Sequence, residues 1–147
     1  MERLIITIIL TLWFFFGAEI GYTNNSEWHT HILYMLAHAN IFHLLGNLLC
    51  LWMIRGGLNL FSSVFIAIAC SFLPAFTIEP TMGFSGVIFA IVGSKWGAYG
   101  QLWNMCKKIL PFVLLTALIP NVNAAIHIYC LFGGYFIQYI IKQLRHD

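Results

Sequence analysis

Long apolar runs alternate along this chain with short breaks that contain polar residues, glycine or proline. Most of the runs are close to the roughly 20 residues that an α-helix needs to cross a bilayer. We interpret each run as one membrane-spanning helix that ends at the next break. The pattern predicts an all-α polytopic membrane protein with a single domain over residues 1–147. Its six predicted spans cover residues 4–20, 32–54, 60–76, 84–103, 109–119 and 122–144.

Composition supports a membrane protein. Hydrophobic residues make up 61% of the chain and charged residues only 8%, whereas a soluble domain is about 25% charged. The lipid bilayer is therefore an expected partner. The formal net charge of +2 is too small to favour nucleic acid as a partner. The four cysteines are widely spaced without a CxxC pair, so no metal site is expected from them.

The charged residues predict how the six spans are oriented. With the N-terminus inside, the basic residues near the span ends fall on the cytoplasmic side, whereas Glu19, Glu27 and Glu79 fall outside. This is the positive-inside pattern of integral membrane proteins, and it predicts that both termini are cytoplasmic. Lys95 lies inside a span, close enough to the inner surface for its long side chain to reach water. The basic residues near span ends are Arg3, Arg55, Lys107, Lys108, Lys142 and Arg145.

Polar side chains inside the predicted spans are candidates for function, because hydrocarbon tolerates them poorly. In the second span, His43 and Asn47 are four residues apart and share one face of a helix. They suit two roles equally well on spacing alone. Either they hydrogen-bond to a neighbouring helix as packing residues, or they donate hydrogen bonds at a reaction site.

Two further spans each combine a stripe of small residues with one polar residue at a similar depth. Ser85 begins the fourth span within the turn Gly83-Phe84-Ser85-Gly86, and His127 lies near the start of the sixth. Small stripes let two helices approach closely, which would bring Ser85 within hydrogen-bonding reach of His127. An adjacent base is what a hydroxyl nucleophile requires. The stripes are Gly86, Ala90, Gly93 and Gly97 in the fourth span and Cys130 and Gly134 in the sixth.

These residues together suggest a hydrolytic site. Attack on an amide creates an oxyanion, for which His43, Asn47 and the backbone N–H of Ser85 are candidate donors. No acidic residue lies near these positions in the sequence, so the site is expected to be a Ser–His dyad. Phe89, one helical turn after Ser85, is placed to stack against the His127 ring.

Three motifs in successive predicted spans resemble the rhomboid intramembrane serine protease family. The resemblance covers about residues 28–138 and implies a six-transmembrane-helix rhomboid fold. It implies that Ser85 is the nucleophile, His127 the general base, His43 and Asn47 the oxyanion donors, and His38 a structural histidine of the outer cavity. The motifs are His38-Ala-Asn-Ile-Phe-His43-Leu-Leu-Gly-Asn47, Gly83-Phe-Ser85-Gly86, and His127 followed seven residues later by Gly134.

The resemblance implies an intramembrane serine endopeptidase that cleaves transmembrane segments of membrane proteins near the outer membrane face. No cofactor and no metal are expected, and the implied location is the bacterial inner (plasma) membrane. The family's fifth helix and the cap loop after it gate entry, and this region here holds Pro111, Pro120 and Asn121. The chain departs from the family in its short first outer loop, at Phe89, where tyrosine is common, and at Cys130, where glycine is usual.

Two other functions fit parts of the sequence. A catalytically inactive rhomboid-like adaptor that binds transmembrane clients would share the fold, but the presence of both Ser85 and His127 favours the protease. A haem- or metal-binding membrane protein would use its histidines as ligands. These histidines crowd into one loop and one helix end, which disfavours paired haem ligation. They are His29, His31, His38 and His43.

Overall fold

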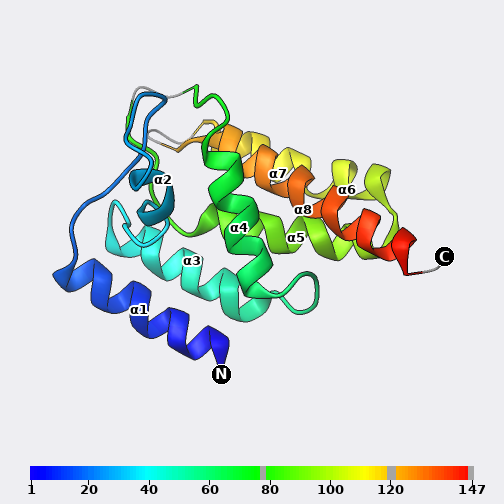
Figure 1. The fold of residues 1–147 in the computed structure, drawn as a ribbon, viewed down its shortest axis with the longest axis horizontal. Helices are drawn as coiled ribbons and strands as arrows, with labels where there is room; N and C mark the ends of the chain where they lie inside the picture. Colours follow the sequence, from blue (N-terminus) through cyan, green and yellow to red (C-terminus); the bar gives the residue numbers. More distant parts are fainter. Residues whose placement is uncertain (77–78, 119–121, 146–147) are drawn as a thin grey trace.

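The computed structural model describes residues 1–76, 79–118 and 122–145. Within these residues the regular structure is helical, apart from an isolated antiparallel bridge between Tyr22 and Thr81. The helices pack into one bundle (Figure 1). They are α1 (Glu2–Phe16), α2 (Thr30–Leu33), α3 (Ile41–Met53), α4 (Leu60–Ser71), α5 (Ser85–Tyr99), α6 (Leu102–Lys108), α7 (Leu110–Thr116) and α8 (Ala124–Leu144).

The prediction of a fold with six membrane-spanning helices, and with it the six-span rhomboid fold, is wrong. Among the described residues, only α8, with 21 residues, is long and apolar enough to cross a membrane. The next longest helices, α1 and α5, have 15 residues each. At 1.5 Å per residue they are about 22 Å long, which is short of the roughly 30 Å hydrocarbon core.

Local chain breaks explain why the predicted spans are too long. The run over residues 32–54 is divided, because α3 begins only at Ile41. There the Asn40 side chain accepts a hydrogen bond from the His43 backbone N–H at 2.9 Å and caps the helix. At the far end of α5, Gly100 adopts a left-handed conformation with φ of +68°, which ends that helix before residue 103. A hydropathy average over a long window does not detect such breaks, so the predicted spans extend past them.

The fifth predicted span, residues 109–119, contains only the seven-residue helix α7. Its predicted end at Ile119 lies outside the described residues. Pro111 lies in the first turn of α7, where proline is tolerated because the first backbone N–H groups have no partner in the helix. Pro120 and Asn121, which the resemblance assigned to the gate, also lie outside the described residues.

Helices α5 and α8 form the most extensive helix contact in the fold and run side by side (Figure 1). Their small residues allow the two backbones to touch. A Cβ atom added at Gly93 or Gly97 would overlap the backbone carbonyl of Leu131 or Tyr135, respectively, on α8. One added at Gly134 would overlap the Ala90 carbonyl on α5. The two stripes of small residues seen in the sequence therefore pack on each other.

The other helices surround this pair. Helix α4 contacts both α5 and α8, and α1 lies alongside α3 (Figure 1). At the end where α5 and α8 begin, three segments are joined by hydrogen bonds. The Asn123 side chain caps α8 through the backbone N–H of Ala125 and donates to Thr81 Oγ1 at 2.8 Å. Thr81 in turn pairs with Tyr22. These contacts hold the loops around the start of α5.

Candidate active site

The packing of α5 on α8 brings Ser85 and His127 together. Ser85 is the first residue of α5, and His127 lies in the first turn of α8. Their side chains meet with Ser85 Oγ and His127 Nε2 2.8 Å apart, although 42 positions separate them in the sequence. His127 is buried, with 6% of its surface exposed. A serine hydroxyl hydrogen-bonded to a buried imidazole is the geometry of a nucleophile with its base.

Two side chains fix the orientation of the His127 ring. The Phe89 ring lies against it, with 4.6 Å between ring centroids and a tilt of 33°. On the other edge, Thr116 Oγ1 of α7 is 3.1 Å from His127 Nδ1. The sequence reasoning missed Thr116. One signal could have found it, because it is the only polar residue in the otherwise apolar segment 109–118.

The turn before Ser85 requires glycine. Gly83 has a φ of +113°, and its backbone N–H donates to the Tyr34 carbonyl at 2.9 Å. A Cβ added there would lie 2.5 Å from Cε1 of His43 and 3.4 Å from Nδ2 of Asn47. The predicted oxyanion donors of α3 are therefore packed against the turn that carries Ser85.

Asn47 has an unused donor close to this turn. The residue is buried, and its Nδ2 has no hydrogen-bond partner among the described residues. A buried amide without a partner is uncommon and calls for an explanation. A donor that is vacant in the resting site is available to an oxyanion that forms during a reaction.

His38 lies next to His43, outside the helices, in the loop between α2 and α3. The two imidazole rings meet edge to face with 5.1 Å between centroids. His38 Nδ1 is 3.2 Å from the Leu36 carbonyl, so this nitrogen carries the hydrogen and donates it. Burial, and to a smaller extent the nearby His43, lower the pKa of His38 to about 4. His38 is therefore neutral at pH 7.

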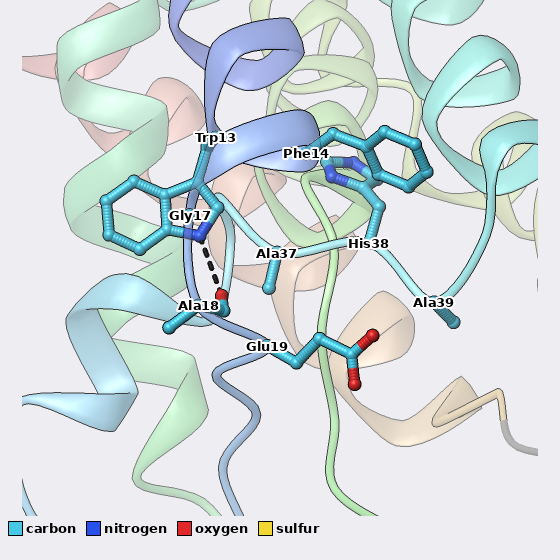
Figure 2. Close-up of a pocket in the computed structure, with 8 residues that line it drawn as sticks. All are labelled: Trp13, Phe14, Gly17, Ala18, Glu19, Ala37, His38 and Ala39. Atoms are coloured by element: carbon cyan, nitrogen blue, oxygen red, sulfur yellow. Dashed lines mark hydrogen bonds between the residues drawn. The ribbon is translucent and has the colours of Figure 1, made fainter.

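A small pocket of about 130 Å³ adjoins His38, between the end of α1 and residues 37–39 (Figure 2). Figure 2 shows Trp13 on one side of the view, Ala37 near the centre, and His38 and Ala39 on the other side. The resemblance assigned His38 to an outer cavity, and this pocket is lined by His38 but not by His43 or Asn47. It therefore stops at His38 and does not reach the donors of α3.

The remaining predicted glycines are packing residues. A Cβ added at Gly86 would lie 3.1 Å from Tyr34 Oη and 3.4 Å from Cys130 Sγ. Gly134 lies against the Ala90 carbonyl, as described above. Gly86 lies in the first turn of α5 and Gly134 farther along α8, and both let the two helices approach closely, which supports the Ser85–His127 contact.

Of the four histidines of the metal-binding alternative, His38 and His43 contact each other, whereas His29 and His31 have other partners. His29 is 3.3 Å from a carboxylate oxygen of Glu27, and His31 Nδ1 is 3.0 Å from the Ser71 carbonyl. Within residues 1–76, 79–118 and 122–145, no three His, Cys, Asp or Glu side chains group closely enough to hold a metal ion.

In comparisons with known proteins, no protein-family model matches this sequence, and no curated protein matches it significantly. The resemblance to rhomboid proteases stays a prediction that rests on its three motifs.

Proposed function

We propose that this protein is a serine endopeptidase that uses Ser85 and His127 as a catalytic dyad and cleaves transmembrane segments of membrane proteins. The observation that carries the proposal is the 2.8 Å contact between Ser85 Oγ and His127 Nε2 at the packed ends of α5 and α8. The vacant Asn47 donor beside the Gly83 turn and the motif resemblance to rhomboid proteases support it.

In the proposed reaction, Ser85 Oγ attacks the carbonyl carbon of the scissile peptide bond while its proton passes to His127 Nε2. The tetrahedral intermediate collapses, the C–N bond breaks, and His127 returns the proton to the leaving nitrogen. A water molecule then loses a proton to His127 and attacks the acyl-enzyme. Collapse of this second intermediate releases the new carboxyl group, and the Ser85 oxygen recovers its proton.

Surface chemistry supports a membrane setting. Besides the candidate span α8, large aromatic side chains are widely exposed to the surroundings, for example Phe42 at 81% and Phe61 at 72%. Exposed large apolar side chains in this number favour contact with lipid, because soluble monomers rarely expose much contiguous apolar surface. Lys107 and Lys108 lie over the rings of Trp103 and Trp96, a combination that suits the boundary between lipid and water.

The distribution of basic residues supports an orientation. Helices α5 and α8 run in parallel (Figure 1). Lys142 lies in the last turn of α8, at the end away from His127, and Lys107 lies in α6, the helix that follows α5. Positive charge at that end favours the cytoplasmic side. The proposal therefore includes an inner-membrane location, a cytoplasmic C-terminal end of α8 and a site toward the outer face, where substrate helices would be cut.

The test uses purified protein in lipid vesicles with a single-span reporter that carries a tag at each end. Wild-type protein is expected to release two fragments, and mass spectrometry is expected to find the new termini near one end of the apolar segment. If the reporter stays intact but copurifies with the protein, the result contradicts the protease and favours a client-binding adaptor.

Asn47→Ala is expected to lower kcat by about 10²–10³, the usual cost of losing one oxyanion donor. Because the dyad remains, residual cleavage should persist. The neighbouring substitution Gly46→Ala is the matched control, since a Cβ at Gly46 meets nothing within 4 Å. Cleavage rates of the reporter under saturating conditions measure both variants. A wild-type kcat in Asn47→Ala would remove Asn47 from the proposed oxyanion site.

A further inference from the structure

Thr116 makes two hydrogen bonds whose directions are fixed by chemistry. Its Oγ1 is 2.6 Å from the Val113 carbonyl oxygen and 3.1 Å from His127 Nδ1. A hydroxyl has one hydrogen, and a carbonyl oxygen can only accept. The Thr116 hydroxyl therefore donates to Val113, and toward His127 it acts as an acceptor.

This direction determines the tautomer of His127. To donate to Thr116, Nδ1 must carry a hydrogen. A neutral imidazole has a hydrogen on only one of its two nitrogens, so Nε2 holds the lone pair. Nε2 is the atom 2.8 Å from Ser85 Oγ. The lone pair thus faces the hydroxyl whose proton a general base must take.

The packing of α7 holds Thr116 in this place. Val113, whose carbonyl accepts the Thr116 hydrogen, is fully buried and packs in a cluster with Met105, Leu131 and Tyr135. Leu131 and Tyr135 belong to α8, the helix that carries His127. The acceptor for the hydroxyl hydrogen is therefore anchored to the same helix as the imidazole.

We propose that Thr116 is a positioning residue for the reaction at Ser85. It holds His127 in the tautomer that can act as a base, and it accepts a hydrogen bond from the imidazolium that forms when Ser85 loses its proton. The role is the one that an aspartate has in Ser–His–Asp triads, here filled by a neutral hydroxyl. This inference rests on the proposed function.

The test compares Thr116→Val, which keeps the side-chain shape but removes the hydroxyl, with Thr116→Ser, which retains it. A hydrogen bond to a charged group suggests that Thr116→Val lowers kcat by about 10- to 100-fold. KM should stay within about twofold, because Thr116 acts through His127. Thr116→Ser should restore most of the rate. Unfolding midpoints for each variant show whether the fold is retained.

A second readout does not depend on activity. In ¹⁵N NMR of histidine-labelled protein, with the His127 signals assigned by loss in His127→Asn, the wild type should show the tautomer with hydrogen on Nδ1. Thr116→Val should show a shift toward the other tautomer, and Thr116→Ser should not.

Three results would overturn the inference. They are a wild-type kcat in Thr116→Val, equal impairment in Thr116→Ser, and a His127 tautomer that Thr116→Val leaves unchanged. In the first two results wild-type protein still cleaves, so the Thr116 role fails while the proposed function stands. If folded wild-type protein does not cleave at all, the proposed function fails and the catalytic role of Thr116 fails with it.

Discussion

Ser85→Ala is expected to abolish cleavage of a transmembrane reporter, and His127→Ala is expected to abolish it to the same extent. The two side chains act as a unit, because the hydroxyl is a poor nucleophile unless Nε2 takes its proton. We expect kcat to fall by at least about 10⁴-fold in either variant. The double variant should be no worse than the single ones. Fragment release over time in vesicles measures all three.

Ser94→Ala is the control for this comparison, because Ser94 lies on the same helix but away from the dyad. Its Oγ accepts a hydrogen bond from the Leu58 backbone N–H at 2.7 Å and donates to the Ile91 carbonyl. Its loss is expected to lower stability while the folded protein still cleaves. Cleavage by Ser85→Ala at the wild-type rate would mean that the nucleophile lies elsewhere.

Gly134→Ala is expected to destabilise the protein strongly, whereas Gly133→Ala next to it is expected to be tolerated. A Cβ at Gly134 overlaps the Ala90 backbone carbonyl, which cannot move without separating α8 from α5. At Gly133 the neighbours are the side chains of Ile66 and Cys70, at 3.1 and 3.5 Å, which can adjust. We expect a loss of about 3 kcal/mol for Gly134→Ala, at the upper end of the usual overpacking cost.

The same pair of variants connects stability to the site. Separation of α5 from α8 would lengthen the Ser85–His127 contact. Gly134→Ala should therefore lower both the cleavage rate and the free energy of unfolding. Gly133→Ala should retain both, since alanine is also the better helix former. Chemical denaturation in detergent measures the free energies, and the reporter assay measures cleavage. Equal stability of the two variants would contradict the close backbone contact at Gly134.

The pairing of Ser85 with His127 could be predicted from the sequence because it depends on local periodicity. Stripes of small residues on two helices mark the faces that pack, and each polar residue lies at the head of its stripe. When the helices pack in parallel, the two polar side chains at the starts of the stripes, Ser85 and His127, meet. Helix spacing therefore carried enough information to predict that these two side chains meet.

The span boundaries could not be predicted, because hydropathy does not register where a helix is capped. Helix α3 begins at Ile41, after its cap Asn40 and nine residues after the start of the predicted span at residue 32. Gly100 ends α5 through a left-handed conformation. Both effects depend on single residues within long apolar runs. The six-span topology failed for this reason.

Thr116 was missed for a different reason. Its contact with His127, eleven positions away in the sequence, depends on how α7 packs against α8. No helical period links the two positions, so only the folded arrangement could reveal the contact. The orphaned donor of Asn47 likewise required three-dimensional burial to be recognised.

Covalent labelling with a fluorophosphonate tests the central claim most directly, because the probe reacts with activated serines and requires no known substrate. Purified wild-type protein is compared with Ser85→Ala and His127→Ala, with an active rhomboid protease labelled in parallel. We expect a single adduct on Ser85 in the wild type, located by peptide mapping, and none in either variant. Folded wild-type protein that stays unlabelled, or that carries the adduct on another serine, would contradict this claim.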